Sequence, residues 1–208
     1  MELKFMEWVN EFLHGSEIFN WIVRIYSTLG DYALLWIGFG IFLLCKKEYR
    51  KYALVFFISL GTGFLLNDMV LKKLVMRERP FQQSEVLKTY VDSYYYSISS
   101  SGFINFLTGS KYPSGSSFPS GHSFCAANAA TFLFLIDKKK LGIPAIVLAA
   151  LMALSRIFMC VHFPTDVLTG LILGTLLAVA AFKIYEKIMK VKELNKEQKK
   201  EESVNENR

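Results

Sequence analysis

Two of the three histidines in this chain stand beside ionisable residues at the ends of apolar segments. His122 begins one apolar segment, and His162 follows another, with Asp166 four residues after it. An imidazole can attack phosphorus as a nucleophile, or donate a proton to a leaving oxygen. A carboxylate four residues further on shares a helical face with the imidazole, if a helix starts there, and can accept its Nδ1 proton. This pattern suits phosphoryl transfer through a phosphohistidine.

Cationic side chains that can hold a phosphate accompany these histidines. Lys72 and Arg79 lie seven residues apart, two helical turns, and point the same way if one helix carries both. Arg156 closes a later apolar segment. Ser120 and Gly121 stand at an expected helix start, where backbone N–H groups favour anions, and Gly121 has no Cβ to keep an anion away. We expect these groups to form one concave oxyanion site.

Each residue alone has a plain structural explanation. An arginine at a helix end commonly reaches the lipid headgroups, and an isolated histidine is commonly a hydrogen-bonded structural group. Other phosphatase chemistries lack their residues: no cysteine is followed by arginine at the required spacing, and the sequence has no Gly-x4-Gly-Lys-Ser/Thr loop. Nor do acids cluster for a two-metal centre. The sequence predicts no cofactor and no metal ion.

The elements that position these residues are apolar segments of nearly bilayer length. Hydrophobic residues make up 52% of the 208 positions, and a helix needs about 20 apolar residues to cross the hydrocarbon core. We predict an all-α membrane bundle of five or six spans, and residues before position 30 would supply the sixth. The five segments are approximately 30–45, 52–71, 122–136, 141–161 and 167–185.

The distribution of lysine and arginine predicts the orientation. Five spans place the loops 46–51 and 137–140 and the chain from Lys183 onward on one side, with 15 of the 24 Lys and Arg residues. Short basic loops are cytoplasmic. We therefore expect an integral protein of the bacterial plasma membrane with its active site on the extracytoplasmic face, and no nucleic-acid partner.

The remaining segments divide the chain further. The sequence of residues 1–29 predicts an amphipathic helix. This helix either lies in the membrane interface or packs on the bundle, and the sequence allows both. Residues 30–190 form the transmembrane domain, in which 81–118 is a long extracytoplasmic loop, either a partly structured cap or a flexible connector. Residues 191–208 predict a charged, frayed and disordered cytoplasmic tail. The apolar face of the first helix comprises Phe5, Trp8, Val9, Phe12 and Leu13.

The motifs together resemble a known family. Lys72-x6-Arg79-Pro80, then Pro119-Ser120-Gly121-His122, then Ser155-Arg156-x5-His162-x3-Asp166 is similar to the three-part signature of the type-2 phosphatidic-acid phosphatase superfamily. The resemblance covers about residues 50 to 186. Membrane members of that family remove phosphate from lipid phosphates or diphosphates without a metal ion, whereas soluble relatives bind vanadate as haloperoxidases.

The resemblance implies a role for each matching residue. His162 is expected to be the nucleophile, with Asp166 as its orienting partner, and His122 the general acid. The expected phosphate-binding residues are Lys72, Arg79, Ser120, Gly121 and Arg156.

Several alternatives remain at this stage. Another hydroxyl in place of water would make the protein a lipid phosphotransferase, and the same cations without chemistry would make it an anionic-lipid binding or transport protein. Undecaprenyl diphosphate, phosphatidylglycerophosphate and phosphatidate are all candidate substrates, because each presents a terminal phosphate at the membrane surface. The sequence does not distinguish among them, and it leaves the oligomeric state open.

Overall fold

The computed structural model describes residues 1–13, 17–96 and 113–206 and is a helical bundle throughout that part of the chain. Helices also cover most of the expected spans, so the predicted all-α fold is confirmed. In chain order the elements are α1 (Glu2–Leu13), α2 (Glu17–Thr28), η1 (Asp31–Ala33), α3 (Leu34–Cys45), α4 (Arg50–Leu65), η2 (Leu66–Leu71), α5 (Lys72–Val75), α6 (Pro80–Gln83), α7 (Glu85–Tyr96), α9 (Gly121–Ile136), η3 (Lys138–Gly142), α10 (Ile143–Phe158) and α11 (Pro164–Glu206).

The apolar helices match the five predicted segments. Three helical runs are long and apolar enough to cross a membrane, Arg50–Gln83, Lys138–Phe158 and Pro164–Glu202, and two shorter apolar helices are α3 and α9. Large apolar side chains point outward, among them Leu168 and Leu176 at 58% and 61% exposure. Such a surface is stable against lipid and costly in water. The protein is an integral membrane bundle, and the number of spans stays a prediction.

Helix α9 lies at the centre of the bundle and packs against α4, α10 and α11. Small residues permit this close packing. A Cβ added at Gly174 of α11 would lie 2.2 Å from the Phe124 carbonyl oxygen, and one at Gly170 would lie 2.6 Å from the Ser120 carbonyl oxygen. The two glycines therefore fix how α11 sits beside the first turns of α9.

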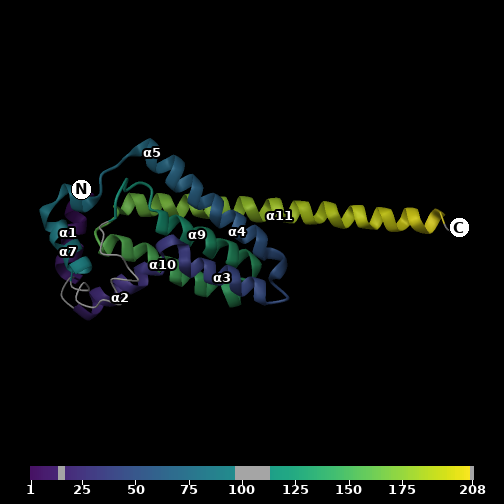
Figure 1. The fold of residues 1–208 in the computed structure, drawn as a ribbon, viewed down its shortest axis with the longest axis horizontal. Coiled ribbons are helices and arrows are strands. Elements are labelled where there is room, and N and C mark those ends of the chain that lie inside the picture. The colour runs from purple at the N-terminus through teal and green to yellow at the C-terminus, as the bar shows by residue number, and fades with distance from the viewer. Residues whose placement is uncertain (14–16, 97–112, 207–208) are drawn as a thin grey trace.

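A second hydrophobic core closes one end of the bundle. Met6 of α1, Val23 of α2 and Val91 of α7 are buried together with Met159 and Val161, which follow α10. Figure 1 shows α1, α2 and α7 gathered at this end. The three helices thus form a cap over the residues that connect α10 to α11.

Helix α1 carries apolar residues on two faces, one buried in the cap and one exposed. Met6 and Asn10 are buried in the cap, whereas Phe5, Trp8 and Phe12 are exposed at 48%, 65% and 84%. Exposed Trp and Phe are typical of a membrane interface. The interfacial location therefore remains our prediction for this helix, now combined with packing on the bundle.

Two flanking segments differ from the sequence-based expectation. Helix α11 continues to Glu206 instead of fraying near residue 190, since Lys, Glu, Gln and Leu are good helix formers and the segment contains no Pro or Gly. The predicted long loop from residue 81 contains α7 and most of α6, so much of it is helical. Residues 97–112 of that loop lie outside the described residues.

Candidate active site

His162 lies in the short connection between α10 and α11 and is held through its Nδ1 atom. The Nδ1–H group donates to the Ser117 carbonyl oxygen at 2.7 Å. The nearest oxygen of Asp166, Oδ2, is 3.8 Å from Nδ1, beyond hydrogen-bonding distance. The sequence-based expectation that Asp166 accepts this proton is therefore wrong in detail. Because Nδ1 carries the proton, Nε2 is left with its lone pair available to a substrate.

Asp166 orients the imidazole indirectly, through the segment that holds it. Helix α11 begins with proline, a residue favoured at the first helical position. In the first turn, Asp166 Oδ2 accepts from the Phe163 backbone N–H at 2.9 Å, which caps the helix, and it also accepts from the Ser117 hydroxyl. One carboxylate thus fixes both the start of α11 and the residue whose carbonyl holds His162.

The environment of His162 keeps its imidazole neutral at neutral pH. The residue is 4% exposed, and this burial lowers the pKa of His162 below its ordinary value. The carboxylate of Asp166 opposes the shift, whereas the charges of Arg79 and Arg156 add to it. A neutral imidazole is the form that can attack phosphorus.

His122 stands in the first turn of α9 and has an acidic partner that the motifs do not contain. Ser120 is the N-cap, and its hydroxyl accepts from the Ser123 N–H at 3.4 Å. The Nε2 atom of His122 is 3.0 Å from Asp31 Oδ1, in the turn that precedes α3. The side chain is 20% exposed, so a leaving group can reach it. The Asp31 carboxylate can only accept, so Nε2 of His122 carries the proton between the two groups.

Lys72 meets the start of α9, as expected, but it does not share a helix with Arg79. Its Nζ atom lies 3.8 Å from the point that a Cβ of Gly121 would occupy, and it pairs with Asp68. The helix ends at Val75, because Met76 adopts a left-handed conformation with φ 47°. The condition that one helix carries both cations is therefore not met, and the two cations reach the site from different elements.

Arg79 is a buried clamp on the chain that leads into α9. Its Nε donates to the Gly115 carbonyl at 3.1 Å, Nη1 to the Val161 carbonyl at 3.0 Å, and Nη2 to the Ser114 carbonyl at 3.2 Å. The planar guanidinium supplies these donors in a fixed geometry that an ammonium group cannot copy. Arg79 therefore joins the segment before α9 to the residue next to His162.

Arg156 lies within electrostatic reach of both imidazoles, and its charge acts on His122 and on His162. It is 4% exposed, and its Nη2 donates to the Ser27 hydroxyl of α2. The Ser120 backbone N–H donates to the Asp166 carbonyl at 3.1 Å, which links the second motif directly to the third. The structure thus brings the three motifs to one end of the bundle (Figure 1).

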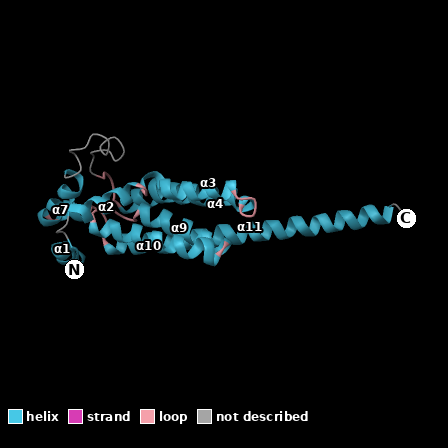
Figure 2. Ribbon diagram, turned by 90° about the horizontal axis from the view of Figure 1, so that it is seen from below, coloured by secondary structure: helices cyan, strands magenta, loops and turns pink. Residues whose placement is uncertain are grey.

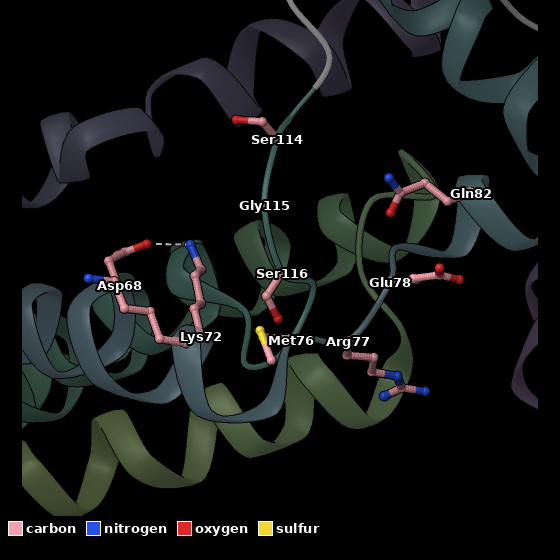
Figure 3. Close-up of a pocket in the computed structure, with 10 residues that line it drawn as sticks. Asp68, Lys72, Met76, Arg77, Glu78, Gln82, Ser114, Gly115 and Ser116 are labelled. Atoms are coloured by element: carbon pink, nitrogen blue, oxygen red, sulfur yellow. Dashed lines mark hydrogen bonds and ion pairs between the residues drawn. The ribbon is translucent and has the colours of Figure 1, made fainter.

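A cavity of about 550 Å³ lies beside this cluster (Figure 3). Lys72 lines it on one side, and the stretch from Ser114 to Ser116 borders it. In the figure, the Lys72 ammonium group points toward Asp68, and the Arg77 side chain points away from Lys72. Lys72 is the residue that this cavity shares with the predicted phosphate site, among the lining residues that the structure describes. In the described part of the chain, no three His, Cys, Asp or Glu side chains form a group that could hold a metal ion.

Sequence reasoning missed four residues at this site: Asp31, Ser117, Arg77 and Glu2. Asp31 gave a weak signal as an acid at the mouth of the first span. Ser117 acts through its carbonyl, which carries no sequence signal. Arg77 and Glu2 are 75 positions apart, so no local pattern relates them.

Comparison with known proteins agrees with this geometry. The sequence model of the PAP2 superfamily matches residues 48–190. Because the match covers well over half of the chain and contains all three motifs, the chain belongs to the PAP2 superfamily. No curated protein sequence matches significantly.

Two solved structures have a similar fold. A transmembrane PAP2-type phosphatidylglycerolphosphate phosphatase from Bacillus subtilis is 28% identical, with a TM-score of 0.62 over 89% of this chain and 86% of that chain. LpxE from Aquifex aeolicus is 21% identical, with a TM-score of 0.59 over 88% of this chain and 94% of that chain. Each similarity covers more of this chain than the family match does.

Proposed function

We propose that this protein is a membrane phosphatase that hydrolyses the terminal phosphate of a lipid phosphate or diphosphate at the extracytoplasmic surface. The observation that carries the proposal is the arrangement of His162, whose Nδ1 proton is held by a carbonyl while Nε2 remains a neutral nucleophile. Membership of the PAP2 superfamily and the similarity to a lipid phosphate phosphatase support the substrate class.

The proposed cycle has two steps at one phosphorus. Nε2 of His162 attacks the phosphorus, the bond to the lipid oxygen breaks, and His122 donates its proton to that leaving oxygen. Water then attacks the phosphohistidine, His122 takes back a proton, and inorganic phosphate leaves with His162 restored. Lys72, Arg79 and Arg156, with the backbone N–H groups near Ser120 and Gly121, stabilise the charge on the transferring group.

The cytoplasmic assignment of the basic loops supports the extracytoplasmic site. Figure 1 places the α3–α4 connection, which contains residues 46–49, at the end of the bundle opposite the cap. The site residues gather at the cap end, so basic loops in the cytoplasm put the catalytic groups on the outer face.

A phosphate-release assay on the purified protein tests the proposal. Phosphatidate, phosphatidylglycerophosphate and undecaprenyl diphosphate are supplied in detergent with EDTA, and we expect release of inorganic phosphate from at least one. The variant His162→Ala should release none while it elutes and unfolds like the wild type. His14→Ala, which alters the histidine far in sequence from the motifs, is the matched control and should retain activity.

The other outcomes of this assay separate the alternatives. A new phosphodiester without free phosphate would indicate transfer to another hydroxyl. Loss of turnover in EDTA would indicate a metal-dependent reaction. Absence of turnover on every lipid, with binding retained, would leave a lipid-binding protein and end the proposal.

A further inference from the structure

The Arg77 guanidinium connects the cap to the Asp166 carboxylate. Its Nη1 atom is 2.6 Å from Asp166 Oδ1, and its Nη2 atom is 2.7 Å from Glu2 Oε2 in α1. The plane also stacks on the Phe163 ring, with 3.8 Å from its central carbon to the ring centroid. Arg77 falls inside the first motif, at one of its unspecified positions, so the motif gives it no role.

Glu2 completes this connection at the start of α11. Its Oε1 atom accepts from the Thr165 backbone N–H at 3.0 Å and from the Thr165 hydroxyl at 2.8 Å. A carboxylate at a helix N-terminus satisfies an unpaired N–H group and interacts favourably with the helix dipole. The first helix of the chain therefore caps the helix that carries Asp166, across 163 positions in sequence.

The contacts continue without a gap to the nucleophile. Arg77 holds one oxygen of Asp166, and the other oxygen holds the Ser117 hydroxyl. Ser117 receives His162 Nδ1–H on its carbonyl, and its own N–H donates to the Arg77 carbonyl at 2.7 Å. Arg77 thus supports the Ser117 segment twice, through its side chain and through its backbone.

We propose that Arg77, anchored by Glu2 of α1, is a positioning residue that holds Asp166 and the Ser117 carbonyl in place and so aims His162. The inference rests on the proposed function for its catalytic meaning. Neither Arg77 nor Glu2 contacts the reacting phosphorus in the proposed cycle. Their removal should therefore reduce the rate of the chemical step more than the binding of substrate.

Charge provides a second consequence for His162. The groups that face it are Asp166 from α11, Arg79 from the start of α6, and Arg156 from α10. When Arg77 is replaced by a neutral residue, Asp166 loses its ion-pair partner and its negative charge acts more strongly on the imidazole. The charged form of His162 becomes more favourable, so its midpoint moves to higher pH.

The test compares Arg77→Gln, Arg77→Lys and Glu2→Gln with the wild type, using Glu11→Gln, an exposed change of the same charge on α1, as the control. We expect Arg77→Gln to lower kcat roughly 10- to 100-fold with KM within about threefold of the wild-type value. Arg77→Lys keeps the charge but reaches only one carboxylate, so it should recover part of kcat. Glu2→Gln should lower kcat less than Arg77→Gln does, because the amide oxygen still accepts from Thr165. Glu11→Gln should match the wild type.

A readout without turnover separates this inference from the proposed function. The chain has only three histidines, so ¹⁵N-histidine NMR in micelles, assigned with His162→Gln, can follow the titration of His162. Its midpoint should rise in Arg77→Gln, as should the acidic limb of kcat/KM. An inactive wild type with that shift would reject the phosphatase and keep the positioning role. An unchanged midpoint, or unchanged kcat in an active protein, would overturn the inference.

Discussion

At the scale of single residues, some side chains of the site can contact the phosphate, and others hold backbone or hydroxyl groups of the protein. His162, His122 and Lys72 have a free functional atom or an open approach, whereas Arg79 and Asp166 are occupied by backbone and hydroxyl partners. The motif residues thus differ in the protein partners that they have in the described part of the chain. The roles of the buried cations stay part of the proposed function.

The contact between Asp31 and His122 predicts that the effect of replacing Asp31 depends on the leaving group. If it supports proton donation by His122, Asp31→Asn should lower kcat on a lipid phosphate roughly 10- to 100-fold. An aryl phosphate leaves readily without a proton, so the same variant should lose much less activity on p-nitrophenyl phosphate. The ratio of the two rates is the measurement.

The control for this experiment is Glu48→Gln, which neutralises an exposed acid in the loop between α3 and α4, away from the site. It should change neither rate. Equal losses on both substrates in Asp31→Asn would assign Asp31 a structural role alone.

The carbonyl contacts of Arg79 predict that a lysine at this position cannot restore full activity and stability. Arg79→Lys keeps the positive charge but abandons most of the carbonyl contacts around residues 114–116 and 161. Each abandoned charged hydrogen bond contributes about 1.5–3 kcal/mol. We expect lower activity together with a lower thermal midpoint in detergent. A variant with reduced activity and wild-type unfolding would instead favour direct contact with phosphate.

At the scale of helices, the packing of α9 against α11 carries the site, because His122 lies in the first turn of α9 and Asp166 in the first turn of α11. Gly174→Ala would push a Cβ against the Phe124 backbone, which cannot move away. Overpacking of this kind costs about 1–3 kcal/mol. Both stability and phosphate release should fall, as measured by thermal unfolding and the release assay.

Gly61→Ala is the matched control for that variant. It also lies in an apolar helix, α4, but nothing lies within 4 Å of its added Cβ. Alanine has a higher helix propensity, so the thermal midpoint should stay the same or rise slightly. A loss in Gly61→Ala as large as in Gly174→Ala would contradict the packing explanation.

Much of this architecture was predictable from sequence, and the reasons are physical. Hydropathy is local, so runs such as 122–136 mark their own helices, and motif spacing groups the ionisable residues. The features that the sequence did not predict depend on backbone conformation or on contacts between distant residues. The break at Met76 depends on a backbone conformation that its side chain does not announce, and the Ser117 carbonyl reaches His162 across 45 positions. Side-chain type alone therefore indicated the chemistry but not which group orients the nucleophile.

At the scale of the whole molecule, native cysteines provide a test of orientation. Cys45 is exposed at the end of α3, next to the basic loop, whereas Cys125 and Cys160 are buried. A membrane-impermeant maleimide should label Cys45 in inside-out vesicles and not in intact cells, and Cys45→Ser should remove the label. Labelling of Cys45 in intact cells would place the basic loops outside the cell and the catalytic end in the cytoplasm. That is the reverse of the proposed orientation.

The length of α11 has a practical consequence for such measurements. Its 43 residues span about 65 Å at 1.5 Å per residue, roughly twice the hydrocarbon thickness. Figure 2 shows the distal half standing clear of the other helices. A fluorophore at Glu202 would therefore stand tens of ångströms from the headgroups, and energy transfer to a lipid dye would serve as a ruler for helix tilt without disturbing catalysis at the far end.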